Sequence, residues 1–198
     1  MGLKDYAIIK AEIDAQTDRG AAVIAGSLLD EHLRWAIDCA FIELSSSTAK
    51  RIFEGVGPLS NFEGRRLIGY ALGLFDREAR EELKTVGEIR NKFAHIIAPV
   101  NFNDRLIVTL CDNLVYPRLY AQVLGDNPSA REKYLHSCWV LRAVVTNQVT
   151  AEDKPDCPIS ARLHEALAES LVGSLPHDKS SERLPSQIQT DSHKPVEK

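Results

Sequence analysis

The chain has 198 residues, 44% of them hydrophobic, which is enough for one substantial core and does not require two domains. The formal net charge of −4 argues against a large basic surface for nucleic acid, so RNA or DNA binding is open only for a local patch and is not indicated by the charge. The sequence has no signal-like core and no run near the roughly 20 apolar residues that span a bilayer, which predicts a cytoplasmic protein that does not enter a membrane.

Apolar residues recur at helical spacing over most of the chain. The spacing predicts helices over about residues 3–15, 17–44, 60–74, 76–98, 104–116, 130–149 and 160–172, with a short one that ends at Phe53. A run of valines near residues 144–149 leaves a short strand as a minor alternative. We therefore expect an all-α protein, a single helical bundle of about six or seven helices.

Capping residues mark where several of these helices begin. Thr17 or Asp18 suits the start of the second helix, and Asp76 suits the start of the fifth, because such side chains accept hydrogen bonds from free N–H groups. Ser60, with a glutamate three residues later, fits a capping box for the fourth helix. Early glutamates of the fifth helix, Glu82 among them, suit its positive N-terminal dipole.

The histidines and cysteines of this sequence show no metal-binding motif. His32 falls on the apolar side of the second helix, where a packed histidine with one hydrogen bond is a more frequent role than a ligand or a catalyst. The cysteines lack zinc-ligand spacing and are expected to be reduced thiols; they are Cys39, Cys111, Cys138 and Cys157. We expect no metal and no cofactor.

The most informative stretch is Arg90-Asn91-Lys92-Phe93-Ala94-His95, late in a helix that must end before Pro99. At about 100° per residue, one apolar sector of this helix collects Ala79, Leu83, Val86, Ile89, Phe93, Ile96 and Ile97. Arg90 lies at the edge of that sector. His95 lies roughly 140° further round and shares the polar side with Lys84, Glu88 and Asn91.

Two interpretations of this stretch follow. An arginine beside an apolar seam keeps its charge, so it requires a carboxylate or a bound anion nearby. In the structural interpretation, Arg90 pairs with an acid of the second helix and His95 is solvated; the candidate partners are Asp30, Glu31 and Asp38. In the functional interpretation, Arg90 clamps a phosphate and His95 serves as an acid or base.

The stretch resembles the signature of HEPN-type helical domains, in which an arginine, often followed by asparagine, precedes a histidine. A longer similarity rests on three ordered blocks, residues 53–62 (FEGVGPLSNF), 69–74 (GYALGL) and 88–95 (EIRNKFAH). Together they resemble the mannitol operon repressor (MltR-like) family. The resemblance covers residues 17–125, extends weakly towards residue 150, and implies an MltR-like, HEPN-related helical fold.

The two resemblances imply different functions. The MltR-like one implies a regulatory or interaction protein, a transcriptional repressor or co-regulator that acts through a protein partner or a dimer surface. The HEPN one implies a metal-independent ribonuclease of a toxin or defence system, with Arg90, Asn91 and His95 catalytic at a homodimer interface. The sequence leaves open whether the protein is an enzyme, since it has no His-Glu-x-x-His, Walker or Gly-x-Ser-x-Gly motif.

The composition changes towards the C-terminus. Residues 150–158 are linker-like, and past Gly173 the apolar content collapses in favour of polar residues that cannot offset the entropy of ordering. We therefore expect residues 1–150 to form the MltR-like helical domain, residues 151–173 a linker and an additional helix, and residues 174–198 a disordered tail.

Overall fold

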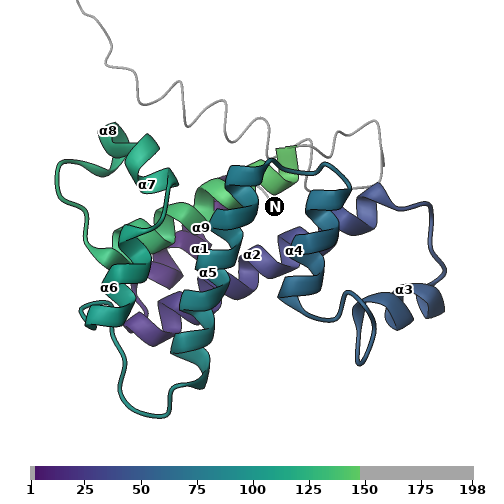
Figure 1. The fold of residues 1–198 in the computed structure, drawn as a ribbon, viewed down its shortest axis with the longest axis horizontal. Helices are drawn as coiled ribbons and strands as arrows, with labels where there is room; N and C mark the ends of the chain where they lie inside the picture. Colours follow the sequence, from purple (N-terminus) through teal and green to yellow (C-terminus); the bar gives the residue numbers. More distant parts are fainter. Residues whose placement is uncertain (1–2, 148–198) are drawn as a thin grey trace, which may run out of the picture.

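The computed structural model describes residues 3–147, in which every regular element is a helix (Figure 1). The helices are α1 (Leu3–Asp14), α2 (Asp18–Ala40), α3 (Ser46–Phe53), α4 (Phe62–Ala71), α5 (Arg77–His95), α6 (Arg105–Asp112), α7 (Tyr116–Leu119), α8 (Ala121–Leu124) and α9 (Ala130–Asn147). Within the described residues, seven have eight residues or more, and α7 and α8 are four-residue turns. The expected all-α bundle is confirmed, and the strand alternative is wrong up to Asn147. The expected linker, additional helix and tail over residues 151–198 lie outside the described residues.

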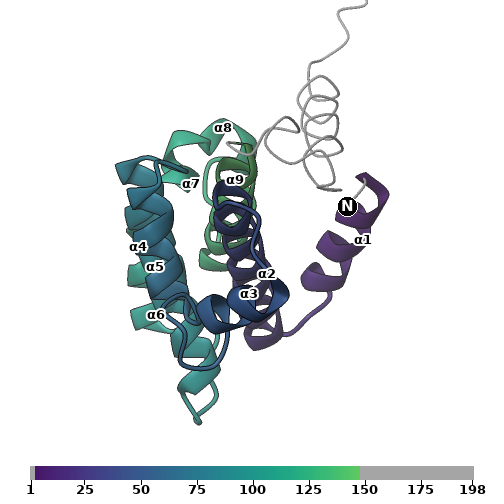
Figure 2. The same cartoon turned by 90° about the vertical axis from the view of Figure 1, so that its right-hand side faces the viewer.

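Helix α2 is the centre of the bundle. Helices α4, α5 and α9 lie along it, whereas α1 stands off to one side (Figures 1 and 2). The first half of α2 buries a run of small residues, Ala21, Ala22, Ala25 and Gly26. Small side chains shorten the distance between packed helices, so α5 and α9 approach α2 closely at this level.

An aromatic cluster fixes the C-terminal half of α5. The ring centroids of Phe93 and Phe102 are 4.7 Å apart, and those of Phe102 and Tyr134 are 5.6 Å apart. Tyr134 is fully buried and donates its hydroxyl proton to the carbonyl oxygen of Ala22 at 2.8 Å. Such ring pairs stabilise a core beyond the effect of their buried area, and here they anchor the helix that carries the arginine–histidine stretch.

The predicted helix starts are partly right. Thr17 and Asp76 each accept a hydrogen bond from the backbone N–H three residues further on, at 3.2 and 2.8 Å. The capping box predicted at Ser60 is wrong. Asn61 caps α4 instead, and Glu63 does not reach back to the cap because it forms an ion pair with Arg66.

Two helix ends also differ from the prediction. Helix α2 stops at Ala40 and not at Leu44, because Phe41 adopts an extended backbone conformation and packs its ring near Phe53. Helix α6 stops at Asp112, before the predicted end at residue 116. Pro117, the residue after that predicted end, lies in the first turn of α7, where its missing N–H costs nothing.

Glu82 is not the solvated glutamate that its place near the start of α5 suggests. Its side chain is fully buried, and its carboxylate accepts hydrogen bonds from the N–H groups of Val115 and Tyr116 at 2.7 and 3.2 Å. The hydroxyl of Ser137 donates a third hydrogen bond at 2.7 Å. Three donors compensate the loss of water around the carboxylate, so Glu82 joins α5, α7 and α9.

Candidate functional site

The arginine–histidine stretch of α5 lies at the boundary between core and solvent. The residues of the predicted apolar sector that belong to α5 are buried, namely Ala79, Leu83, Val86, Ile89 and Phe93. Ile97 is fully exposed instead, because α5 ends at His95 and the helical periodicity no longer applies there. Arg90 lies at the edge of the sector, with 22% of its side chain exposed.

The Arg90 guanidinium is held from three sides. Its Nη1 atom lies 3.6 Å from Oδ2 of Asp30 on α2. Its Nε and Nη2 groups donate hydrogen bonds to Oδ1 of Asn91 at 3.3 and 3.1 Å. Its central carbon lies 5.4 Å from the ring centroid of Phe62 on α4, within range of a cation–π interaction. The positive charge is thus positioned by α2, α4 and α5 together.

Two glycines make room for this arrangement. A Cβ atom on Gly26 would come within 2.8 Å of the Cγ and Cδ atoms of Arg90 and within 2.9 Å of the Tyr134 hydroxyl oxygen. A Cβ atom on Gly87 would come within 2.9 Å of the Phe62 ring. The aliphatic part of Arg90 therefore crosses α2 at Gly26, and the Phe62 ring packs on α5 at Gly87.

Asp30 is shared by two arginines. Its Oδ1 accepts a hydrogen bond from Nη1 of Arg65 at 2.6 Å, while its Oδ2 faces Arg90. Arg65 is itself buried, and its Nε donates to the carbonyl oxygen of Leu59 at 2.8 Å. A buried charge is tolerated when it is paired and hydrogen-bonded in this way. Arg65, Asp30 and Arg90 form a triad that joins α4, α2 and α5.

The other two acids proposed for Arg90 lie elsewhere. Glu31 and Asp38 line a separate hollow between α2 and α3, and Glu31 lies 4.0 Å from Arg34. Of the three candidate partners, Asp30 is therefore the one that the fold brings to Arg90.

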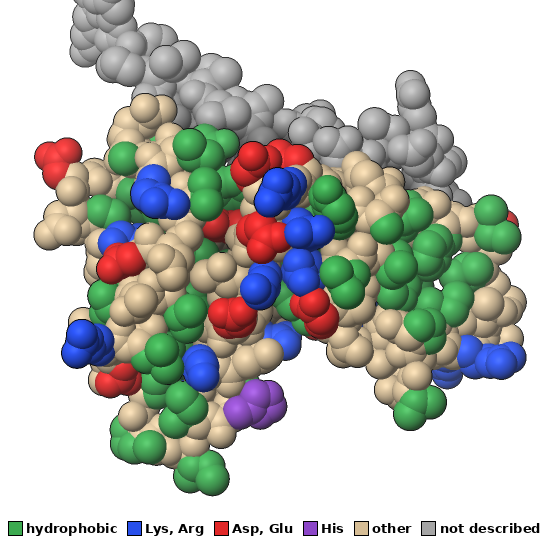
Figure 3. All heavy atoms as spheres, viewed as in Figure 1, with side chains coloured by type: hydrophobic (Ala, Val, Ile, Leu, Met, Phe, Trp, Pro, Cys, Tyr) green, Lys and Arg blue, Asp and Glu red, His purple; other side chains and the backbone are tan. Residues whose placement is uncertain are grey.

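A surface hollow of about 400 Å³ opens beside Arg90 between α4 and α5. Its lining residues are Asn61, Phe62, Glu63, Lys84, Gly87, Glu88, Arg90 and Asn91. Charged side chains of both signs gather over this part of the molecule (Figure 3). The hydrogen bonds from Arg66 lower the pKa of Glu63, so this carboxylate is ionised at pH 7. The side chains that line the hollow therefore carry no net charge, since two are cations and two are anions.

The fold separates the members of the predicted catalytic set. Arg90 and Asn91 are hydrogen-bonded to each other, and both line the hollow. His95 is exposed at the last position of α5 and is not among the lining residues. Within one copy of the described chain, the arginine and the histidine do not converge on a common point.

His32 has the role that the sequence predicts. It is buried on α2, and its Nδ1 lies 2.7 Å from the carbonyl oxygen of Leu28. Burial lowers the pKa of His32 to about 4, so the ring is neutral at pH 7 and Nδ1 carries the donated proton. The packed histidine with one hydrogen bond is confirmed.

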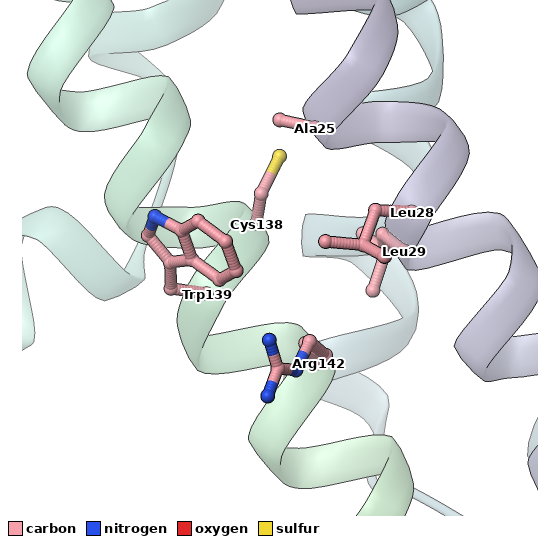
Figure 4. Close-up of a pocket in the computed structure, with 6 residues that line it drawn as sticks. All are labelled: Ala25, Leu28, Leu29, Cys138, Trp139 and Arg142. Atoms are coloured by element: carbon pink, nitrogen blue, oxygen red, sulfur yellow. The ribbon is translucent and has the colours of Figure 1, made fainter. Parts of the chain in front are cut away.

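A second, smaller hollow lies between α2 and α9, beside the core. Its walls are Ala25, Leu28 and Leu29 on one side and Cys138, Trp139 and Arg142 on the other (Figure 4). It leaves no room for a water molecule. Burial raises the pKa of Cys138 to about 12, and a thiol that stays protonated is a poor nucleophile. This hollow therefore offers neither room for a substrate nor a reactive thiol.

Residues 3–147 contain neither a metal-binding group of side chains nor a membrane-spanning helix. No group of three or more histidine, cysteine, aspartate or glutamate side chains is arranged to hold a metal ion in this part of the chain. Nor does any helix there combine the length and the apolar character needed to cross a bilayer.

Sequence reasoning missed Arg65 as a part of this site. It was overlooked because a charged residue in a helix is usually solvated.

Comparison with known proteins shows a similarity of fold only. No protein-family model matches the sequence, and no curated protein matches it. A chain in the X-ray structure of the MtlR–HPr complex from Escherichia coli is similar, with a TM-score of 0.52, 20% identity, and coverage of 67% of this chain and 92% of that chain. A possible transcriptional regulator, YggD from Shigella flexneri 2a, is similar with a TM-score of 0.51, 19% identity, and coverage of 76% and 98%. The protein therefore has the helical fold of MtlR and YggD.

Proposed function

We propose that this chain is a regulatory protein that acts by binding a partner protein. The observation that carries the proposal is the extent of the fold similarity, which covers 92% of a chain in the complex of MtlR with HPr and 98% of a possible transcriptional regulator. Regulation through a partner also agrees with the net charge of −4, because direct binding to operator DNA relies on a basic surface.

The hollow beside Arg90 is the surface we propose for recognition of the partner. It presents Lys84 and Arg90 together with Glu63 and Glu88. Balanced charges of this kind suit a protein surface with a complementary pattern, on which they set the orientation of binding. Asp30 and Phe62 hold Arg90 in one position, which lowers the entropic cost of using it in a contact.

An exchange of charges on the rim tests this proposal. Lys84 and Glu88 lie 4.0 Å apart, one helical turn from each other, and both are about half exposed. The double variant Lys84→Glu/Glu88→Lys inverts the local pattern but keeps the net charge and the pair. The matched control is Lys10→Asp/Asp14→Lys, which exchanges a comparable exposed pair on α1.

The readout is the set of transcripts in the source organism after deletion of the gene. We expect deletion to change the levels of specific transcripts. Complementation with wild type or with Lys10→Asp/Asp14→Lys should restore those levels. Lys84→Glu/Glu88→Lys should fail to restore them and should capture less partner protein in cross-linked cells. Unchanged transcripts after deletion would contradict the regulatory proposal, and full restoration by the α5 exchange would contradict the recognition surface.

A metal-independent ribonuclease of the HEPN type is the second candidate. It is favoured by the hydrogen bonds that Arg90 donates to Asn91 at the edge of the hollow. A phosphate group that entered the hollow would meet a cation held in a fixed position. Catalysis would require His95 from a second protomer, since His95 of the same chain does not line the hollow. Incubation with cellular RNA in EDTA tests this candidate function. If wild type cleaves the RNA and His95→Ala does not, the ribonuclease replaces the regulatory protein as the proposed function.

A further inference from the structure

A hollow of about 530 Å³ opens where α7 and α8 meet the end of α6 and the start of α9. Figure 1 shows these elements together at one end of the bundle. The hollow shares no lining residue with the one beside Arg90. Sites for small molecules in proteins measure roughly 300–1,000 Å³ and combine apolar walls with a few polar groups. This hollow has that size, and its lining is of that kind. We refer to it as the α7–α8 hollow.

The floor of the α7–α8 hollow is apolar and uncharged. It consists of Cys111, Leu114 and Pro117, which are all buried by the fold and still line the hollow. Burial raises the pKa of Cys111 to about 12, so its thiol carries no charge at pH 7. An apolar group placed on this floor would leave water, which is favourable.

The fold holds the walls around this floor in place. The buried carboxylate of Glu82 accepts hydrogen bonds from the N–H groups of Val115 and Tyr116, and thereby fixes the start of α7. Across the hollow, Lys133 of α9 donates a hydrogen bond to Asp112 of α6 at 2.7 Å. These two charges neutralise each other. The shape of the hollow therefore does not depend on a ligand, as is usual for small-molecule sites.

Two further charges line the α7–α8 hollow, and within residues 3–147 neither has a partner. Arg118 of α7 and Asp126, in the loop after α8, are both exposed, and neither forms an ion pair or a side-chain hydrogen bond in this part of the chain. Gly125 ends α8 with φ 83° and ψ −179°, a conformation that is essentially confined to glycine. The turn at Gly125 brings the next residue, Asp126, to the hollow. One cation and one anion thus border an apolar floor.

We infer that the α7–α8 hollow binds a small zwitterion with an apolar group, of the class of the apolar α-amino acids. The guanidinium of Arg118 donates paired hydrogen bonds to the carboxylate of the ligand. The ammonium group of the ligand faces Asp126, and its apolar side chain covers the floor. A ligand with a single charge leaves either Arg118 or Asp126 without a partner, so the hollow selects for both charges in one molecule.

Ligand-observed NMR with the full chain tests the inference. Leucine, methionine and phenylalanine are added singly at millimolar concentrations. For each amino acid, the matching carboxylic acid without the amino group and the matching amine without the carboxylate are added separately. We expect saturable binding of at least one amino acid, and binding about tenfold weaker for both of its analogues. If none of the three amino acids binds, or if the analogues bind equally well, the inference is overturned.

Substitutions of the two charged residues locate the site. Arg118→Gln and Asp126→Asn each remove one charge from an exposed side chain, so circular dichroism should stay unchanged. Each should raise the Kd of the amino acid about tenfold. Asp126→Asn should weaken the amino acid but not its carboxylic acid analogue, because that analogue has no ammonium group. The control is Arg51→Gln, at an exposed arginine of α3, which should bind like wild type.

Two results with these variants would contradict the inference. Unchanged affinity for the amino acid in both Arg118→Gln and Asp126→Asn would show that it binds elsewhere on the chain. An equal loss of the amino acid and of its carboxylic acid analogue in Asp126→Asn would show that Asp126 does not face the ammonium group. Both results are independent of whether the chain binds a partner protein, because the ligands are added to the purified chain.

Discussion

Arg90 on α5 lies 3.6 Å from Asp30 on α2, and the second oxygen of the same carboxylate accepts a hydrogen bond from Arg65 on α4 at 2.6 Å. One acid thus connects three helices of the bundle. The arginine of the arginine–histidine stretch is held inside this connection, with only its outer edge at the hollow. This placement predicts a structural role for Arg90, whatever the hollow binds.

Removal of Arg90 is therefore expected to weaken the fold. Arg90→Met should lower the free energy of unfolding by about 1–3 kcal/mol, because Asp30 loses one of two partners while the aliphatic contact with Gly26 is kept. Asp30→Asn should cost more, since it leaves two arginines unpaired. Urea denaturation measures both. Lys92→Ala, an exposed change on the same helix, is the control, and equal stability of Arg90→Met and wild type would contradict the structural role.

Gly26 is expected to be intolerant of even a methyl group. Gly26→Ala should lower the free energy of unfolding by about 1–3 kcal/mol, because the new Cβ meets the Arg90 side chain and the Tyr134 hydroxyl, which are both held in place. Gly20→Ala on the same helix meets mainly the end of the flexible Gln16 side chain and should cost less. Thermal or urea unfolding of the two variants side by side gives the comparison. A Gly26→Ala protein as stable as Gly20→Ala would show that Arg90 does not cross α2 there.

Glu82 is expected to tolerate no loss of charge. Glu82→Gln replaces an oxygen that accepts with an amide that donates, which leaves at least one buried N–H or hydroxyl of Val115, Tyr116 and Ser137 without an acceptor. The expected loss of stability is about 1–3 kcal/mol. Glu81→Gln, next to it and exposed, should have little effect. Amide hydrogen exchange should show faster exchange at Val115 and Tyr116 in Glu82→Gln alone, and unchanged exchange would rule out the proposed contact.

His32 makes stability depend on pH in the acid range. Burial lowers its pKa from 6.5 to about 4 in the folded chain, so on acidification the unfolded chain takes up the proton first. Stability is therefore lost as pH falls below 6.5, by about 2 kcal/mol between pH 7 and pH 5 from this group. His32→Gln keeps a donor but does not titrate. Wild type should lose more stability than this variant over that range, and parallel pH profiles would refute the assignment.

Part of the fold follows from sequence periodicity. The apolar sector of α5 is recovered from Ala79 to Phe93 because helical spacing and burial agree while the helix lasts. The prediction fails at Ile97 because periodicity says nothing about where a helix stops, and α5 stops at His95. Phe41 ends α2 early for a similar reason, since its contact with Phe53 is tertiary.

The composition of the site was less predictable. Arg90 and its possible partners on α2 could be named from helix faces, but the choice among Asp30, Glu31 and Asp38 depends on the rotation of two helices against each other. Arg65 could not be placed, because a sequence does not show which charge is buried once a partner is available. The same limit applies to Glu82, whose donors come from residues more than thirty positions away.

His95 gives the most direct test of the regulatory proposal against the catalytic one. It is exposed at the end of α5 and lies outside the hollow, so His95→Ala should change the free energy of unfolding by less than about 0.5 kcal/mol. The decisive measurement is transcript profiling of a deletion strain complemented with folded His95→Ala. The regulatory proposal predicts that the variant restores the wild-type transcripts. Failure of a stable His95→Ala protein to restore them, together with loss of RNA cleavage in EDTA, would contradict it and identify the chain as a nuclease.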